Sequence, residues 1–393
     1  MLLVLVVGGF DYAMLVQQKS SLQSAADTAA VASAKGLSLA DARRENVDHV
    51  AQAIVDGMVR ANTLERVGTS APLVATRVKA EPLEVEVSIR QPVRSSFGGR
   101  FGLSVNEITV RSVARVIGSP NICVLALETA EPGAIHLESR SRLTGNDCAV
   151  FSNSGSSQGL TVRDAAMLTA STICTAGGVL GRGSISPDPY VDCPRFEDPL
   201  AERPEPDAGA CDHVLTIVLA QVRTLSPGVY CGGLTITGSS EVTFEPGIYV
   251  IRNGLFTVSG ASSIAGHGVG FYLQGASSFL FDPLTRISLA APTDGPMAGL
   301  LFFGSRSQSK LLVNTILSGG AQLLTGTIYL PTTSFVADSL ARIGSASAYT
   351  AIVTRRLTLL DGPNLVLNAN YGDTDVPVPE GIKAIGQAAR LVK

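Results

Sequence analysis

The feature that most constrains this fold is a repeat inside the second half of the chain. Residues 225–231 (LSPGVYC) match residues 244–250 (FEPGIYV) at a step of 19 residues, and a weaker copy follows at 268–273 (GVGFYL). Repeats of this length are typical of architectures in which each unit buries its apolar side only against its neighbours. The repeat therefore indicates a stack of similar units.

Short apolar segments continue this pattern toward the C-terminus, at 299–303, 326–330, 349–353 and 365–367, with Gly, Ser, Asn and Thr between them. The chain has 40 Gly and 20 Pro in 393 residues, no Trp and only 16 % charged residues, which is the composition of turn-dense β-structure. Short strands with glycine-rich corners, in units of about 20 to 27 residues, predict a β-solenoid, or β-helix-like, domain.

The alternative fold for this region is a β-sandwich, whose hairpins should alternate between wet and dry side chains. Runs such as 228–231 (GVYC) and 300–303 (LLFF) alternate poorly, which favours the solenoid. The dipeptides Pro227-Gly228 and Pro246-Gly247 suit corner turns and not the middle of a strand.

The cysteines predict disulfides. All six lie in one central stretch and none has the C-x-x-C spacing of a zinc or redox site, so an oxidising compartment is expected. Cys148 and Cys174 each follow a Leu-Thr pair, and we pair them across adjacent strands, although six cysteines allow 15 connectivities. A crosslink is also expected near the Pro- and acid-rich loop that Cys193 and Cys211 flank. The candidates are Cys123, Cys148, Cys174, Cys193, Cys211 and Cys231.

The N-terminus opens on ten apolar residues, 1–10 (MLLVLVVGGF), followed by Asp11 and Tyr12. A bilayer needs about 20 apolar residues, so we expect the first half of a transmembrane anchor to lie upstream of Met1, with Asp11 and Tyr12 at the anchor boundary. Residues 17–34 contain no Gly or Pro and predict a helix with a stripe of mostly small residues. The stripe consists of Leu15, Leu22, Ala26, Ala29, Ala30 and Ser33.

Residues 36–118 predict a small α+β unit. We expect Gly36 to end the first helix, and a second amphipathic helix to run from a capping box at Ser38 and Asp41 to about Asn62. The alternation at 84–90 and 108–116 predicts two strands with one solvated face.

The N-terminal segment resembles a known family. Asp11-Tyr12 followed by residues 18–32 (QKSSLQSAADTAAVA) is similar to the N-terminal signature of the TadE/TadG-like proteins of the tight-adherence (Flp) pilus machinery. In that family a transmembrane helix ends in an acidic residue and continues as an Ala-rich helix. The short apolar run is where this chain departs from the pattern.

Segments between residues 148 and 331 also resemble the periplasmic part of TadG-like proteins. They are Cys148–Ser154 (CAVFSNS), Asp198–Leu200 (DPL), Pro227–Gly233 (PGVYCGG), Ala291–Phe302 (APTDGPMAGLLF) and Gly326–Pro331 (GTIYLP). The resemblance implies a pilus-related protein with an extracytoplasmic domain.

The sequence offers little for catalysis or nucleic-acid binding. With 30 Lys plus Arg against 33 Asp plus Glu the net charge is −3, so there is no basic excess to bind phosphates. The four histidines are dispersed, and there is no phosphate-binding loop, dinucleotide fingerprint or Gly-x-Ser-x-Gly nucleophile. The acidic loop offers oxygen ligands for calcium at Asp188, Asp192, Glu197 and Asp198, but it lacks a Gly-centred ligand loop, which favours a solvated turn.

The sequence therefore predicts a mainly β chain with N-terminal α-structure. The expected divisions are an anchor helix at 1–35, an α+β linker unit at 36–118, a β-helix-like extracytoplasmic domain at 119–376 and a C-terminal tail at 377–393. We expect a non-enzymatic component of a Flp (Tad) pilus without cofactor or metal. It would be anchored in the inner membrane, face the periplasm or the exterior, and contact other pilus proteins through its N-terminal helix. The β-helix-like domain could also contact a surface or a glycan. The alternative to a pilus component is a secreted or surface carbohydrate-active β-helix enzyme or adhesin.

Overall fold

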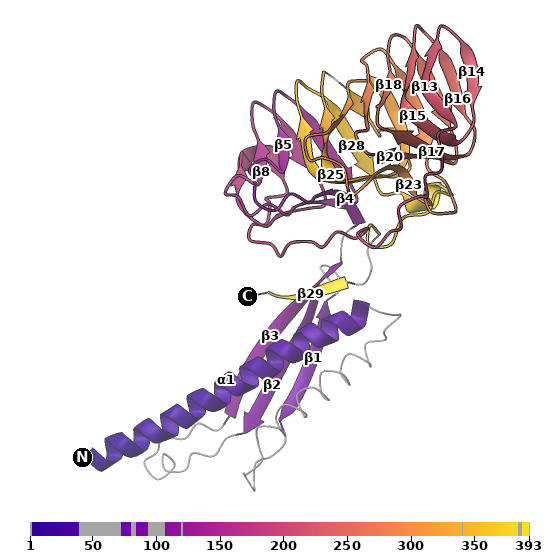
Figure 1. Cartoon of the computed structure of the whole chain (residues 1–393). Coiled ribbons are helices and arrows are strands. Elements are labelled where there is room, and N and C mark those ends of the chain that lie inside the picture. Colours follow the sequence, from indigo (N-terminus) through magenta and orange to yellow (C-terminus); the bar gives the residue numbers. More distant parts are fainter. Residues whose placement is uncertain are drawn as a thin grey trace. The chain divides into compact units, whose positions relative to one another are not determined.

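Two compact units make up the computed structural model: Met1–Ser119 with Ala384–Lys393, and Pro120–Lys383. The structure describes residues 2–38, 72–79, 84–92, 107–118, 121–339, 341–383 and 387–392. Figure 1 shows one long helix in the first unit and many short strands side by side in the second. The prediction of a mainly β chain with an N-terminal helix is confirmed.

The first unit combines helix α1 (Leu2–Ser38) with a four-stranded antiparallel sheet of order β1-β2-β3-β29. Its strands are β1 (Leu73–Lys79), β2 (Glu84–Pro92), β3 (Glu107–Gly118) and β29 (Gln387–Val392). The strands predicted at 84–90 and 108–116 are confirmed as β2 and β3. Residues 387–392 of the predicted tail form β29, which pairs with β3.

Two local expectations for the first unit have different outcomes. The prediction that Gly36 ends the helix is wrong, because α1 continues to Ser38. A glycine inside a helix costs only about 1 kcal/mol and does not end it unaided. The predicted second helix, which was to reach about residue 62, lies outside the described residues.

The second unit holds a 25-stranded sheet whose strand pairings are parallel. We call each turn of chain, with its two or three strands, a rung. The first rungs are β4 (Asn121–Ala126), β5 (Ile135–Leu137) and β6 (Arg142–Asn146); β7 (Cys148–Ser152), β8 (Leu160–Val162) and β9 (Met167–Thr169); and β10 (Thr172–Thr175), β11 (Val179–Leu180) and β12 (Ile185–Ser186).

The remaining rungs follow residues 187–212, which we call the strap. They are β13 (His213–Leu219) and β14 (Val222–Leu225); β15 (Gly228–Thr237) and β16 (Glu241–Phe244); β17 (Gly247–Arg252), β18 (Leu255–Val258) and β19 (Ser263–Gly266); β20 (Val269–Gln274), β21 (Ser278–Phe281) and β22 (Arg286–Ala290); β23 (Leu300–Gly304), β24 (Val313–Ile316) and β25 (Gly320–Ala337), which continues into the next rung with β26 (Arg342–Ile343); and β27 (Thr350–Leu359) and β28 (Asn364–Asn368).

Each strand pairs in parallel with the equivalent strand of the next rung, as β4 does with β7 and β17 with β20. This pattern differs from the hairpins expected of a β-sandwich. The order of rungs in space is not the order in the chain, because β27, near the C-terminal end of the unit, pairs with β4, near its start. The unit therefore begins and ends in the middle of its own stack, where the Ile122 N–H donates to the Ile382 carbonyl at 2.9 Å.

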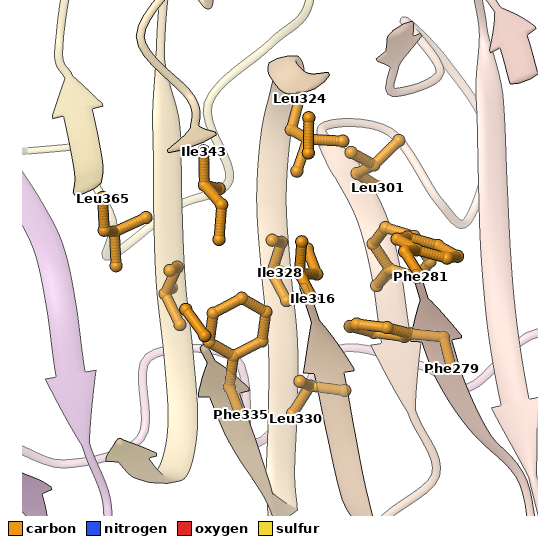
Figure 2. Packing of buried hydrophobic residues seen from close by; sticks show 14 of the residues in the cluster. Phe279, Phe281, Leu301, Ile316, Leu324, Ile328, Leu330, Phe335, Ile343 and Leu365 are labelled. Carbon is orange, nitrogen blue, oxygen red and sulfur yellow. The ribbon is translucent and has the colours of Figure 1, made fainter. Parts of the chain in front are cut away.

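Columns of equivalent side chains fill the interior of the stack. One column passes through successive register partners, all fully buried: Tyr249, Phe271, Phe302, Ile328, Ile352, Val124, Val150 and Ile173. Figure 2 shows the same interior further along the rungs, where Phe279, Phe281, Ile316 and Phe335 lie together. Each rung thus supplies one layer of a continuous apolar core.

The two Pro-Gly dipeptides lie at corners, as predicted. Gly228 and Gly247 are the first residues of β15 and β17, with φ of 154° and 143°. A Cβ on Gly247 would approach the Pro227 ring to 2.4 Å, so the corner of one rung leaves room only for glycine in the next.

Candidate functional site

The C-terminal half of α1 is packed against the sheet by small side chains. Its buried residues recur at three- and four-residue steps: Leu22, Ala25, Ala26, Ala29, Ala30, Ser33 and Ala34. They meet the buried faces of β2 and β3, including Val85, Val87 and Val110. The predicted stripe is confirmed in this part, and its methyl groups let the helix lie close to the strands.

The N-terminal part of α1 is different. In Figure 1 it extends past the ends of the strands, and none of the side chains described between Ala13 and Ser21 is buried. Asp11 and Tyr12 lie within this part of the helix, and their side chains are outside what the structure describes. No helix in the described part of the chain contains a stretch long and apolar enough to cross a membrane.

All six cysteines form disulfides, but the predicted pairing of Cys148 with Cys174 is wrong. The bridges are Cys123–Cys148, Cys174–Cys193 and Cys211–Cys231. In the parallel pairing of β10 with β7, Cys174 lies opposite Phe151 and not opposite Cys148. The two cysteines also face opposite sides of the sheet, since Cys148 is fully buried while Cys174 is partly exposed.

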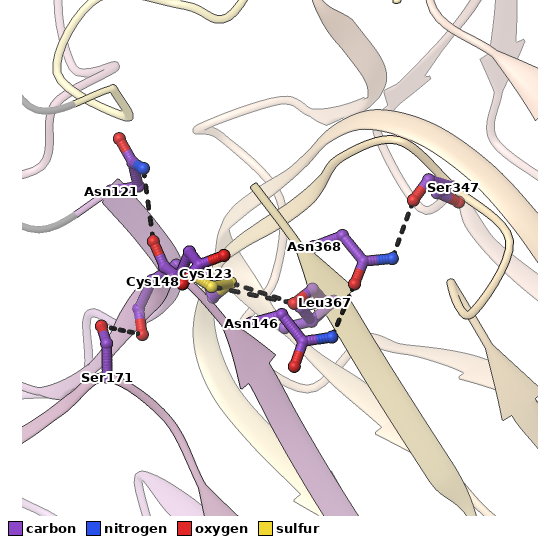
Figure 3. The surroundings of a disulfide bond; sticks show 9 residues. Asn121, Cys123, Asn146, Cys148, Ser171, Ser347, Leu367 and Asn368 are labelled. Carbon is purple, nitrogen blue, oxygen red and sulfur yellow. Dashed lines mark hydrogen bonds between the residues drawn. A yellow bond between two sulfur atoms is a disulfide. The ribbon is translucent and has the colours of Figure 1, made fainter. Parts of the chain in front are cut away.

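The Cys123–Cys148 bridge links neighbouring rungs within the core. Cys123 is the extra residue of an irregularity in the pairing of β4 with β7, between Ile122 and Val124. Both cysteines are buried, and their sulfur atoms lie 3.6 and 3.8 Å from the Leu367 carbonyl oxygen. Figure 3 draws the bridge beside Leu367. The bridge therefore ties β4 to β7, and its sulfur atoms lie next to β28, which is held by its own pairing with β6.

The other two bridges hold the ends of the strap. Cys193 is tied to β10, in the last rung at one end of the stack, and Cys211 is tied to β15, near the other end. A crosslink near this loop was expected, and the structure has one at each end of it. The strap thus connects the two ends of the stack, and the chain then winds back toward β27.

The strap covers an apolar strip on the outside of the stack. The strip is a second column of register partners: Val229, Val250, Tyr272, Phe303, Tyr329, Val353, Leu125 and Phe151. Leu200 of the strap is 3 % exposed within the same cluster, and Phe196 and Ala208 pack at its margin. Outward side chains that would otherwise meet water are thereby buried.

Two strap carboxylates accept hydrogen bonds from tyrosines of this strip. The Tyr329 hydroxyl donates to Asp198 Oδ2 at 2.8 Å, and the Tyr272 hydroxyl donates to Glu205 Oε2 at 2.6 Å. Burial, followed by the nearby Glu205 carboxylate, raises the pKa of Tyr272 to about 12, so this hydroxyl keeps its proton.

Glu205 and Arg306 form the centre of this contact. The Arg306 backbone N–H donates to Glu205 Oε1 at 2.8 Å, and the Ser305 hydroxyl donates to Oε2 at 3.1 Å. Burial by itself would raise the pKa of Glu205. The hydrogen bonds from Tyr272, Arg306 and Ser305, together with the positive charge of Arg306, outweigh burial and hold this pKa below its ordinary value. The Arg306 guanidinium also donates to two strap carbonyls and lies 5.2 Å from the Phe303 ring centre.

Near the other end of the strip, Asn153 holds the strap through both atoms of its amide. Its Nδ2 donates to the Phe196 carbonyl at 2.7 Å, and its Oδ1 accepts from the Phe196 N–H at 2.8 Å. Asn153 is 5 % exposed, so both of these polar groups find their partners out of water.

Two ion pairs fasten the place where β27 meets the first rung. Arg355 pairs with Glu128 and Arg356 with Glu131, each at 2.9 Å. Burial disfavours the Glu128 carboxylate, but the hydrogen bonds from the Ala130 N–H and the Arg355 guanidinium dominate and lower its pKa. These contacts join residues that are more than 220 positions apart in the chain.

The described residues include no group of three or more His, Cys, Asp or Glu side chains placed to hold a metal. Of the acids considered for calcium, Asp198 accepts from Tyr329 and the Leu200 N–H, and Asp188 pairs with Arg182 at 3.0 Å. These two carboxylates therefore have other partners.

An open groove of about 600 Å³ crosses the outer face of β16, β19 and β22. Its lining combines Val, Ile and Leu residues with the hydroxyl and amide side chains of Thr243, Ser263, Ser288 and Gln322, and its charged residues are Arg286 and Glu241. Glycoside hydrolysis uses a pair of carboxylates, and Glu241 is the acid among the residues that line this groove.

These features define a disulfide-linked, mainly β protein with a helix packed by small residues at its N-terminus. Residues 1–36 match the Tad family model, described as "Putative Flp pilus-assembly TadE/G-like". The N-terminal segment is thus TadE/G-like, and the predicted resemblance is confirmed there. No curated protein and no solved structure gives a significant match to the chain.

The sequence did not reveal the polar contacts of the strap. Asp198 and Tyr329 are 131 positions apart, and Glu205 and Arg306 are 101 apart, so no local pattern joins them. The sequence feature that could have indicated these contacts is the composition of the loop. A long Pro-rich segment between two cysteines has to be held by the surface that it crosses.

Proposed function

We propose that this protein is a non-enzymatic structural or assembly component of a Flp (Tad) type IV-like pilus. The observation that carries the proposal is the TadE/G-like match of residues 1–36, which falls on the described helix α1. The small buried face of α1 from Leu22 onward is occupied by its own sheet. In this proposal the part before Leu22, in which no described side chain is buried, contacts other helices of the pilus machinery.

In this proposal α1 anchors the protein in the inner membrane, and the second unit faces the periplasm or the exterior. Three disulfides suit an oxidising compartment on that side of the membrane. The boundary of the membrane anchor would fall at Asp11 and Tyr12.

The second unit would act as a β-solenoid, in keeping with the parallel pairing of each rung with the next. A stack closed by a strap and two end bridges is a rigid body suited to a mechanical role. Asn153, Asp198 and Tyr329, which hold the strap, all lie in segments on which the resemblance to TadG-like proteins depends. A glycan contact would use the groove over β16, β19 and β22.

The test is piliation of cells that produce the full chain or a form lacking residues 2–16. We expect the deletion to abolish piliation while the second unit keeps its three bridges, because residues 2–16 lie outside the compact unit that contains these bridges. Mass spectrometry of sheared pili and of inner membranes then shows whether the protein enters the filament. Normal piliation by the deleted form, or glycan cleavage by the purified chain, would contradict the proposal.

A control variant should disturb α1 elsewhere. Ala29→Leu places a larger side chain in the fully buried contact between α1 and the sheet, so it tests the packing of the first unit and not the part of the helix before Leu22. A pilus defect in the deletion that Ala29→Leu does not reproduce at equal protein level assigns the function to the N-terminal part.

A further inference from the structure

A row of arginines runs along one face of the stack. The last strands of successive rungs pair with one another, from β14 through β22 and β26 to β12, and form what we call the third face. Arg286 of β22, Arg342 of β26 and Arg142 of β6 are exposed on it, while the next residue of each of these strands is buried. The alternation of a strand therefore directs these three side chains to solvent, and we call them the arginine row.

The pairing register places the members of the arginine row two rungs apart. The uncharged Gly320 lies between the first two and the uncharged Asn364 between the last two. Two rungs of about 4.8 Å separate neighbouring arginines by roughly 10 Å. This spacing is close to the screening length of about 8 Å at physiological salt, so the arginines repel one another little. An extended anion that lies along the face nevertheless meets all three of them.

The arginine row has no counter-charge among the described residues. None of its guanidinium groups forms an ion pair or a side-chain hydrogen bond with them. Acids lie at the corner before the third face, among them Asp282, Asp338 and Glu138, but they make other contacts or stand apart from the row. Glu138 pairs with Arg163 at 2.6 Å, and Asp338 accepts from the Ser339 hydroxyl at 3.1 Å. The guanidinium groups of the row can therefore bind an anion from outside.

Neutral hydrogen-bonding groups stand beside the arginine row. Ser288 comes two residues after Arg286, and Thr144 two residues after Arg142, so each lies on the same side of its strand as the arginine and is half-buried. The groove over β16, β19 and β22 is lined by Arg286, Ser288 and Gln322, so it receives one end of the row. Hydroxyl and amide groups next to fixed charges are suited to the hydroxyls of a sugar.

We propose that the arginine row and this groove bind an acidic polysaccharide, whose carboxylates pair with the guanidinium groups. A guanidinium binds a carboxylate through two parallel N–H···O bonds, which the ammonium group of a lysine does not match. The polysaccharide lies across the rungs, and its hydroxyls lie over Ser288 and Thr144. The register places Glu241 two rungs beyond Arg286, where its negative charge ends the stretch that attracts an acidic chain.

Two other anionic partners fit this face less well. Single-stranded nucleic acid is held by aromatic side chains on which its bases stack, and none of the residues named on this face is aromatic. Anionic lipid surfaces attract clusters of about four to eight basic residues, whereas the arginine row has three. The proposal rests on the proposed function in placing the second unit outside the cytoplasm, and it makes the glycan contact named there specific.

The test is binding of the purified full chain, in mild detergent, to polygalacturonate, measured by titration calorimetry at low and at physiological salt. We expect binding that weakens as salt rises and is lost with the fully methyl-esterified polymer, which has the same backbone without the charge. Arg342→Gln removes the central member of the row and should weaken binding about fivefold. Addition of Arg142→Gln and Arg286→Gln should abolish it.

Lys310→Gln is the matched control for these variants. Lys310 is also an exposed cation, but it lies between β23 and β24 and not on the third face, so its loss should leave binding unchanged. Equal unfolding midpoints for all variants show that the fold is intact. A weaker complex with Lys310→Gln than with Arg342→Gln would assign the binding to overall charge and contradict the proposal.

Three further results would overturn the proposal: equal binding of the charged and the esterified polymer, undiminished binding by the triple variant, or binding of single-stranded DNA or anionic vesicles in place of polygalacturonate. Piliation plays no part in this measurement. The form that lacks residues 2–16 should bind the polymer as the full chain does, so a failure of the pilus role and a failure of polysaccharide binding are seen separately.

Discussion

Glu205 shows how one side chain fixes an irregular segment to a regular surface. Its two oxygens accept hydrogen bonds from Tyr272, Ser305 and the Arg306 backbone, which belong to two different rungs. The strap has no β-ladder of its own between Cys193 and Cys211, so bonds of this kind and the burial of Leu200 hold it against the strip.

We expect Glu205→Gln to lower the free energy of unfolding by about 1 kcal/mol at pH 7, since the carboxylate is one-third exposed and only partly screened. The folded pKa of Glu205 lies below its ordinary value of 4.5, so its contribution is complete above that pH. It is lost as the pH falls through the folded pKa. Denaturant unfolding from pH 7 to about pH 3 should show a shallower loss of stability for the variant than for the original chain.

Glu202→Gln is the control for this prediction. Glu202 lies in the same strap but is exposed, so the substitution removes an equal charge without removing those contacts. Identical acid profiles for the two variants would assign the effect to net charge and contradict the role given to Glu205.

Among the elements, the sequence predicted the strands and turns that depend on neighbouring residues, but not the contacts between distant segments. The strands at 84–90 and 108–116 and the two Pro-Gly corners follow from alternation and turn chemistry, which neighbours in sequence determine. The disulfide partner of Cys148 cannot be predicted from such local signals. It depends on the register of β7 against β4 and β10 and on the irregularity at Cys123. Oxidised cysteines could be predicted, while their connectivity required the fold.

Peptide mapping under non-reducing conditions should give bridges between Cys123 and Cys148, Cys174 and Cys193, and Cys211 and Cys231. A peptide that joins Cys148 to Cys174 would contradict the register of the first rungs. The double variant Cys211→Ser with Cys231→Ser opens a loop with a sequence separation of 20, and we expect it to cost about 3 kcal/mol of unfolding free energy.

The variant that lacks the Cys211–Cys231 bridge should loosen only the end of the strap that precedes β13. Limited proteolysis is expected to cut first between the strap contact at Glu205 and β13, with the rungs staying intact. Serine substitutions at Cys123 and Cys148 serve for comparison, because this bridge lies in the core and its loss should loosen the junction with β28 instead.

In the whole molecule, the spatial order of the rungs differs from their order along the chain, because the strap carries the chain from one end of the stack to the other. A repeat predicts that neighbouring units pair, and this holds from β13 to β28 and from β4 to β12. It does not predict that β27 returns to β4, because that contact depends on a strap long enough to reach the far end of the stack. The exposed β13 and the closing pair Arg355–Glu128 are both consequences of this path.

This path predicts which pieces of the chain fold. Residues 120–383, whose ends meet at Ile122 and Ile382, should fold alone in an oxidising compartment with three bridges and a β-rich circular dichroism spectrum. Residues 120–207 retain Cys123, Cys148, Cys174 and Cys193 but lose β27 and all of the strip except Leu125 and Phe151, so we expect this piece to stay unfolded and protease-sensitive. Its first rung would expose one edge of β4 and the inner face that β27 and β28 cover. A protease-resistant 120–207 with both native bridges would show that the first rungs form a unit of their own, and the closing contact of β27 with β4 would then be an addition to a finished fold and not a condition for it.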